Sequence, residues 1–175
     1  MQYQIEFLML GLIVILGIFA MCFIATGIKI LKEWERAAIL RLGKYLGVRG
    51  PGIIWITPIL DKVAAVVSLR NQETRVDTGE YVSSDGSTRR LTGYISWRVI
   101  DVEKAVLSVE NYEHSLFNLV SHSVQKIAES FPGDTVMMDE ESLYSEIRQT
   151  IEPTLSNWGI EINEINLKFV SEWDR

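Results

Sequence analysis

Few residues in this chain could carry chemistry, and two histidines are the first of them. His114 and His122 are eight residues apart, close to two turns of a helix, so they could share one helical face. A zinc site needs further Cys, His or carboxylate ligands at suitable spacing, and none lies between them. Solvated or capping histidines are therefore the favoured interpretation. Ser115, Ser121 and Ser123 lie nearby, but the Gly-x-Ser-x-Gly turn that presents a nucleophilic serine is missing from the sequence.

An acidic run and a glycine-rich turn complete the candidates for chemistry. The carboxylates of residues 139–141 could bind a divalent cation, but they open a predicted helix, whose exposed amide groups attract negative side chains. Helix capping is therefore preferred. Three glycines surround Pro51 without the Lys-Ser or Lys-Thr pair of a phosphate-binding loop. Cys22 is the single cysteine, which excludes an intrachain disulfide. We expect no enzyme, no cofactor, no bound metal and no small-molecule substrate.

The dominant feature of the chain is an uncharged apolar run of 22 residues, 7–28, between Glu6 and Lys29. A helix of this length spans about 33 Å, enough for the roughly 30 Å hydrocarbon core of a bilayer. A cleaved signal peptide would have basic residues before a shorter apolar core, and the first six residues include none. A buried core helix rarely begins a chain at this length. We expect a short non-cytoplasmic N-terminus at residues 1–6 and one transmembrane helix at residues 7–28.

Charge is distributed unevenly on the two sides of this run. Residues 29–49 hold six Lys or Arg against two Glu, a net charge of +4. The positive-inside rule therefore predicts a single-pass protein of the cell membrane, with its N-terminus outside and its C-terminal domain in the cytoplasm. Residues 50–175 carry a net charge of −9, which argues against nucleic-acid binding. The predicted membrane-interface residues beside the helix are Tyr3, Lys29, Lys32, Trp34 and Arg36.

A second apolar segment follows the turn at residues 50–52. It is too short to cross a bilayer, which takes about 20 residues. Two interpretations remain open: a buried strand, or a wedge that rests in the membrane interface with Trp55 as its anchor. The segment begins 24 residues after Lys29, close enough to reach the bilayer. Its apolar residues complete the predicted membrane-interface set: Ile53, Ile54, Trp55, Ile56, Ile59 and Leu60.

The rest of the sequence predicts strands followed by helices. Strands are expected at 36–42 and 62–69, and again at 73–83 and 87–99, where Ser84-Asp85-Gly86 predicts a hairpin. The alternation of apolar and polar residues along 87–99 indicates one buried and one solvent-exposed face, as an antiparallel sheet allows. The side chains assigned to one face are Leu91, Gly93, Ile95 and Trp97.

From Asp101 the apolar residues recur every three or four positions, which predicts helices. Asp101 should cap a helix over 102–109, and Asn111 a longer helix that ends at 132–134. A third helix should open near Asp139 and close at 157–159, with Pro153 kinking it or shortening its last turn. A final strand is expected over 160–169. The fold class is therefore α+β, with a mainly antiparallel sheet and about three helices. The predicted buried helix faces are Leu116, Leu119, Val120, Val124, Ile127 and Phe131, and Leu143, Ile147, Ile151 and Leu155.

An ordered set of motifs resembles stomatin-like (slipin) proteins of the band 7, or SPFH, superfamily, also called the prohibitin-homology superfamily. The resemblance covers about residues 28–169, and it predicts a band 7 domain over residues 29–169. The motifs, in order, are IKILKEWERAAILRLGK at 28–44, GPGIIWITPILD at 50–61, SDG at 84–86, GYISWRV at 93–99 and WGIEI at 158–162.

The resemblance implies a non-catalytic, membrane-bound scaffold that forms homo-oligomers. Such proteins corral membrane patches and modulate proteases, channels or respiratory complexes, and bacterial relatives often accompany an NfeD-type membrane partner. Family members continue into a long helix that drives assembly, whereas residues 170–175 hold only the start of such a helix. A fragment and a naturally short form both fit this ending. The alternative is a monomeric, membrane-tethered binding module for a single partner protein.

Overall fold

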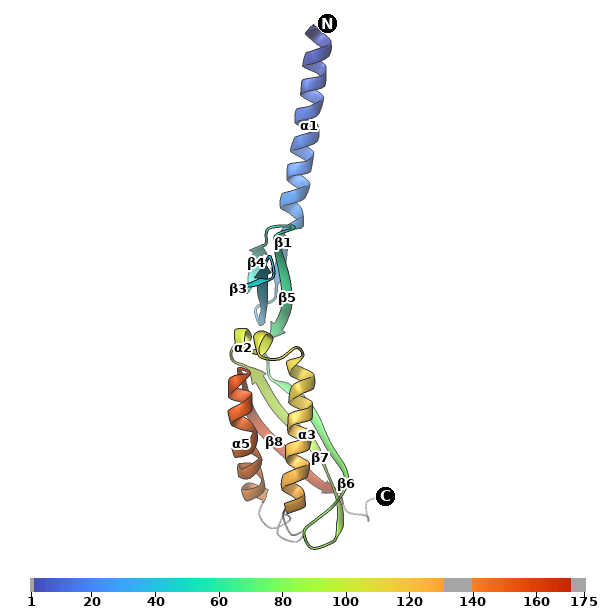
Figure 1. Ribbon diagram of the computed structural model, residues 1–175, viewed down its shortest axis with the longest axis vertical. Helices are drawn as coiled ribbons and strands as arrows, with labels where there is room; N and C mark the ends of the chain where they lie inside the picture. The colour runs from blue at the N-terminus through green and yellow to red at the C-terminus, as the bar shows by residue number, and fades with distance from the viewer. Residues whose placement is uncertain (1, 131–139, 171–175) are drawn as a thin grey trace. The chain divides into compact units, whose positions relative to one another are not determined.

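A computed structural model describes residues 2–130 and 140–170 of the chain (Figure 1). The chain divides into two compact units, Met1–Val66 and Val67–Arg175. The first unit contains the apolar helix and small antiparallel sheets. The second contains one larger antiparallel sheet with helices against it. The α+β class predicted from the sequence is therefore confirmed.

The apolar run folds as helix α1, Gln2–Thr26. Its described side chains are almost all exposed, and its length and composition would allow it to cross a membrane. The helix ends two residues before the apolar run does, because Ile28 already belongs to a strand. Gly27 joins the two, and a Cβ at this position would lie 2.5 Å from the carbonyl oxygen of Ile56. Only glycine fits between α1 and the strands that follow.

The strands of the first unit form two small sheets. In one, β1 (Ile28–Leu31) pairs antiparallel with β4 (Gly52–Trp55). In the other, β2 (Glu35–Arg41) lies between β3 (Lys44–Arg49) and β5 (Asp61–Ser68). β2 and β5 match the strands expected at 36–42 and 62–69, whereas β1 and β3 were not predicted. The core they enclose consists of Leu31, Ala37, Ile39, Ile54 and Ile56, with Val63 packed against it.

The second unit is built on a three-stranded antiparallel sheet. Its order is β6 (Gln72–Val82), β7 (Thr88–Val99) and β8 (Ile160–Val170), with β7 in the middle. The hairpin predicted between β6 and β7 is confirmed. In its turn, the N–H of Ser83 donates to the carbonyl of Ser87, and the N–H of Gly86 donates to the carbonyl of Ser83, both at 2.9 Å.

The predicted alternation along β7 is also confirmed. Leu91, Ile95 and Trp97 are buried, with exposed fractions of at most 2%. Gly93 lies on the same strand, opposite Leu167 of β8. A Cβ on Gly93 would collide with the carbonyl oxygen of Asn166 and the Cα of Leu167. Glycine at this position therefore allows the close pairing of β7 with β8.

Helices α2 (Val102–Leu107), α3 (Tyr112–Ser130) and α5 (Glu140–Asn157) complete the second unit, with α3 packing on α5 and both packing on the sheet (Figure 1). Asp101 caps α2 by accepting from the N–H of Lys104, and Asn111 caps α3 by accepting from the N–H of His114. Helix α5 continues past Pro153 to Asn157. The residues predicted to end the second helix and open the third, 131–139, lie outside the described residues.

The buried helix faces agree with the predicted ones where the structure describes them, and the predicted Phe131 lies outside the described residues. On α3, Leu116, Val120, Val124 and Ile127 are buried, and Leu119 is half-buried. On α5 the buried residues are Leu143, Ile147, Ile151 and Leu155. These side chains and the inner face of the sheet form the core of the second unit, because the helical period places apolar residues at three- and four-residue steps on one side.

Candidate membrane-contacting surface

The surface of interest begins where α1 ends. The N–H of Ile56 donates to the carbonyl of Gly27 at 2.9 Å, which fixes the end of β4 beside the end of the helix. A Cβ at Gly27 would also lie 2.6 Å from Nε1 of Trp55. The indole of Trp55 therefore packs on the one residue between α1 and β1. Tryptophan is enriched at the membrane–water interfaces of membrane proteins, because its ring is apolar and its N–H is polar.

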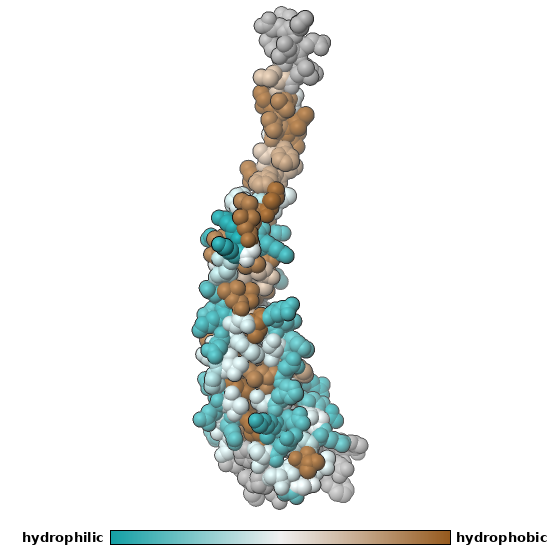
Figure 2. All heavy atoms as spheres, in the orientation of Figure 1, coloured by the Kyte–Doolittle hydropathy of each residue, from teal (hydrophilic) through white to brown (hydrophobic). Residues whose placement is uncertain are grey.

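One face of the β1–β4 pair is apolar and exposed. The register places Ile28 opposite Trp55 and Ile30 opposite Ile53. These four side chains are exposed by 47%, 52%, 77% and 77%, respectively. Figure 2 shows hydrophobic residues exposed along α1 and again among the strands that follow it. A contiguous exposed apolar face of this kind is typical of a protein or membrane contact. We call Ile28, Ile30, Ile53 and Trp55 the apolar face.

Within the predicted 53–60 segment, buried and exposed side chains alternate along β4. Ile54 and Ile56 belong to the core of the first unit, as expected for a buried strand. Ile53 and Trp55 lie on the apolar face, and Ile59 and Leu60 are exposed in the loop between β4 and β5. The buried-strand interpretation therefore holds for Ile54 and Ile56. Contact of the exposed residues with lipid stays a prediction.

Three members of the predicted interface set, Lys32, Trp34 and Arg36, lie at or beside the turn between β1 and β2. Nζ of Lys32 lies 3.6 Å from Oε1 of Glu35 and 5.9 Å from the centre of the Trp34 ring. Nη1 of Arg36 donates to the carbonyls of Glu33 and Glu35, at 2.7 and 2.9 Å. This turn lies at the far end of β1 from Gly27, about 13 Å of extended chain away.

The two remaining members of the set lie apart from that turn. Lys29 is exposed on β1, opposite Ile54 in the register. Tyr3 lies within α1, and its side chain is not among those described.

An ion pair that the sequence analysis missed stabilises the 57–60 loop. Nε and Nη2 of Arg41 donate to Oδ1 and Oδ2 of Asp61, at 2.6 and 3.0 Å, and Oδ2 also accepts from the N–H of Thr57 at 2.8 Å. The Asp61 side chain is only 4% exposed. The Arg41 guanidinium and the Thr57 amide hold the pKa of Asp61 well below its usual range, against the opposing effect of burial. The sequence signal was an Arg after the apolar residues 37–40 and an Asp after the apolar pair Ile59-Leu60.

The residues considered for chemistry are not brought together. His114 and His122 are both exposed on α3, and Glu141 is exposed on α5. Residues 2–130 and 140–170 contain no group of three His, Cys, Asp or Glu side chains placed to hold a metal ion. Asp139 lies outside the described residues. Cys22 is exposed on α1.

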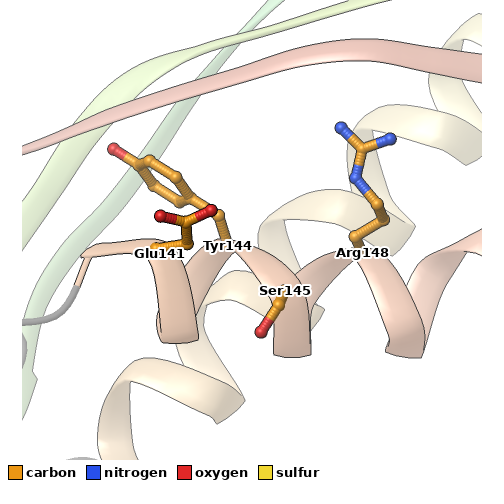
Figure 3. A pocket seen from close by; sticks show the side chains of 4 residues that line it. All are labelled: Glu141, Tyr144, Ser145 and Arg148. Carbon is orange, nitrogen blue, oxygen red and sulfur yellow. The ribbon is translucent and has the colours of Figure 1, made fainter.

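A shallow groove of about 480 Å³ on α5 is lined by Glu141, Tyr144, Ser145 and Arg148 (Figure 3). The Tyr144 hydroxyl donates to the carbonyl of Leu167 at 3.0 Å and accepts from its N–H at 3.3 Å. Nη1 of Arg148 lies 3.5 Å from the carbonyl of Ile162. Both contacts satisfy backbone groups at the outer edge of β8, which protects that edge from pairing with another strand. The Ser145 hydroxyl donates to the carbonyl of Ser142, as is ordinary for a helical serine.

Comparison with known proteins agrees with this architecture. Residues 29–171 match the SPFH domain / Band 7 family. A stomatin homolog of Pyrococcus horikoshii is 33% identical over 156 residues, which are 89% of this chain and 58% of that protein. An uncharacterized protein of Methanocaldococcus jannaschii is 34% identical over 88% of this chain and 77% of its own length. Mouse stomatin is 27% identical over 82% of this chain and 51% of its own length.

A candidate membrane-spanning helix at the N-terminus and the stomatin relatives together indicate a membrane-associated protein. The chain belongs to the SPFH domain / Band 7 family, and its relatives include stomatins. It spans 58% of the length of the Pyrococcus relative and about half that of mouse stomatin. The family is generally non-catalytic.

Proposed function

We propose that this protein is a membrane-anchored, non-catalytic scaffold that forms homo-oligomers and organises membrane microdomains or regulates membrane proteins such as proteases or channels. One observation supports the anchoring above all others. A single glycine separates α1 from strands whose exposed face is apolar. If α1 crosses a bilayer, β1 and β4 begin in the headgroup region, where the apolar face can leave water. Each large apolar side chain that does so gains up to about 1.5–3 kcal/mol.

The proposed topology follows the charge on either side of α1. Residues 29–49 carry a net charge of +4, and residues 1–6 have no basic side chain. Transmembrane proteins keep such basic segments in the cytoplasm. We therefore place the N-terminus outside the cell membrane, and the strands of the first unit and the whole second unit in the cytoplasm. The basic side chains beside the helix would also attract anionic lipid, by about 1 kcal/mol for each residue near the surface.

The proposed scaffold role rests on the family. An NfeD-type membrane protein and a membrane protease are the proposed partners, and both come from the family resemblance. A second candidate function is a monomeric, membrane-tethered binding module for one partner protein. The groove on α5 favours it, because that groove presents the exposed carboxylate of Glu141 to a partner.

The mass of the protein extracted in mild detergent tests the scaffold against the binding module. Light scattering after size-exclusion chromatography, corrected for bound detergent, should give a multiple of the 19.9 kDa chain mass for a homo-oligomer. A protein mass equal to one chain at all concentrations would reject the oligomeric scaffold and favour the tethered module. Chemical crosslinking in native membranes before extraction controls for dissociation by the detergent.

A further inference from the structure

Two exposed apolar residues of the first unit have unusual backbone conformations. Ile59 has a φ of +77° and is 92% exposed, and Leu42 has a φ of +50° and is 76% exposed. A positive φ is uncommon for any residue with a Cβ and is a genuine outlier for a β-branched one. Such conformations persist only where the surrounding structure enforces them, and they concentrate at functional sites. Exposure to water does not stabilise an apolar side chain, so solvation does not explain why Leu42 and Ile59 are held outward.

The enforcing contacts are specific. The Arg41–Asp61 ion pair ties the end of β2 to the start of β5. The Asp61 carboxylate and backbone N–H both bond to the backbone of Thr57, which closes the loop around Ile59. The N–H of Leu42 donates to the carbonyl of Leu60 at 2.9 Å, so the β2–β3 turn is held against this loop. These bonds hold the backbones of Leu42 and Leu60 side by side, and we call the exposed side chains of Leu42, Ile59 and Leu60 the apolar tip.

The apolar tip is tied to the end of α1. Thr57 opens the loop directly after Ile56, whose N–H donates to the carbonyl of Gly27 at 2.9 Å. Ile59 therefore lies three residues from the residue that caps the helix end. The tip is separate from the apolar face, because it comes from the β2–β3 turn and the β4–β5 loop rather than from β1 and β4.

Cationic side chains flank the tip. Lys44 follows the Leu42 turn and Lys62 follows the 57–60 loop, and both are exposed. In the described part of the chain no ion pair engages either lysine, whereas the carboxylate of Asp61 is already neutralised by Arg41. The tip therefore presents apolar side chains with two uncompensated positive charges beside them. This combination fits the boundary between acyl chains and headgroups of an anionic bilayer.

We propose that the apolar tip inserts into the surface of an anionic bilayer, with Leu42, Ile59 and Leu60 in the acyl–headgroup boundary and Lys44 and Lys62 against the lipid phosphates. The Arg41–Asp61 ion pair sets the loop in its inserting conformation before lipid is met. The inference deepens the proposed function and rests on it, since α1 brings the tip to the membrane. It adds a second lipid contact and selects lipids by charge.

The test uses the full chain in vesicles of phosphatidylcholine with phosphatidylglycerol. In a Cys22→Ser background, single cysteines at Leu42, Ile59, Ile53 or Glu33 carry an environment-sensitive NBD label. Glu33 is the matched control, because it is exposed in the β1–β2 turn, at the far end of β1 from Gly27. Labels at 42 and 59 should emit at shorter wavelength and be quenched by lipids with nitroxide groups near the top of the acyl chain. The label at 33 should respond like free dye.

The outcomes separate this inference from the proposed function. Quenching at 53 without quenching at 42 and 59 would overturn the tip and leave the apolar face in place. A blue shift at 42 and 59 without quenching by lipid nitroxides would show a protein partner there and would also overturn it. An absence of quenching at 42, 59 and 53 in protein that resists alkaline extraction would reject both lipid contacts.

The lipid charge is tested separately. In the Ile59-labelled chain, Lys44→Gln and Lys62→Gln should each lower the inserted-to-free ratio of the tip about fivefold in anionic vesicles, the equivalent of about 1 kcal/mol per lysine. They should have little effect in pure phosphatidylcholine. Lys104→Gln, an exposed lysine of the second unit, is the matched charge control. Equal quenching in both vesicle types for every variant would reject the selection of anionic lipid.

Discussion

The ring of Trp97 packs edge-on against the ring of Tyr112, with centroids 6.2 Å apart and planes at 78°. The indole N–H of the same Trp97 donates to Oγ1 of Thr74 at 2.8 Å. One side chain of the central strand β7 therefore contacts both the neighbouring strand β6 and the first residue of α3. Edge-on aromatic pairs of this geometry contribute about 0.5–1.5 kcal/mol beyond the area they bury.

The burial of Tyr112 predicts a loss of stability at high pH. Burial, with the nearby charge of Glu113, raises the pKa of Tyr112 to about 12 in the folded chain. The unfolded value is about 10, so folding favours the protonated phenol. Its stabilising contribution is complete below about pH 10 and is lost as the pH rises through about 12. Between these values the melting temperature of Tyr112→Phe should fall less steeply than that of the wild type, measured by circular dichroism. Tyr94→Phe, on an exposed side chain, should follow the wild type.

Gly93→Ala should destabilise the second unit strongly. The added methyl group would collide with the backbone of β8 at Asn166 and Leu167, and backbone yields less readily than a side chain. Overpacking of this kind costs about 1–3 kcal/mol or more. Thr92→Ala, at the preceding residue, controls for the strand position. Denaturant unfolding of the purified protein in detergent measures both. Equal midpoints for the two variants would contradict the close packing of β7 on β8.

Tyr144→Phe should expose the edge of β8 while keeping the aromatic ring. The hydroxyl bonds to both the N–H and the carbonyl of Leu167, and each net hydrogen bond is worth about 0.5–1.5 kcal/mol. The amide of Leu167 should exchange with deuterium faster in this variant, as measured by mass spectrometry. Ser145→Ala, in the same groove but bonded within its own helix, should leave that exchange unchanged. Unaltered exchange at Leu167 in Tyr144→Phe would show that the hydroxyl does not protect the edge.

The proposed topology predicts one-sided labelling of the hairpin. Ser84 is exposed in the turn between β6 and β7, so Ser84→Cys in a Cys22→Ser background gives a single accessible thiol. A membrane-impermeant maleimide added to intact cells should leave it unmodified and should react after permeabilisation. Cys22→Ser alone is the background control. Modification in intact cells would place this domain outside and reverse the orientation inferred from charge.

The sequence predicted the second unit better than the first because periodicity is a local signal. The apolar steps along α3 and α5 and the alternation along β7 are repeated several times, so their buried faces were identifiable residue by residue. β1 was missed because Ile28 continues the apolar run of the helix, and nothing local marks where the helix ends. β3 was missed because Gly47 and the exposed Leu46 and Val48 give it no clear alternation.

The candidate surface was predicted as a segment, but its geometry required the fold. No local pattern assigns Ile54 to the core and Ile53 to the surface, because both are isoleucines in one apolar stretch. The Arg41–Asp61 ion pair joins residues 20 positions apart, so it is a property of the tertiary structure. The positive φ values at Leu42 and Ile59 are enforced by such distant contacts and leave no trace in residue type.

The connection between α1 and the sheets at Gly27 is short and has little conformational freedom. One residue connects them, the hydrogen bond from Ile56 straps β4 to the same point, and no side chain larger than hydrogen fits there. A flexible linker would absorb a change in helix tilt, whereas a strapped joint transmits it as torque to β1 and β4. If α1 crosses a bilayer as proposed, a change in bilayer thickness that alters its tilt therefore also moves β1 and β4.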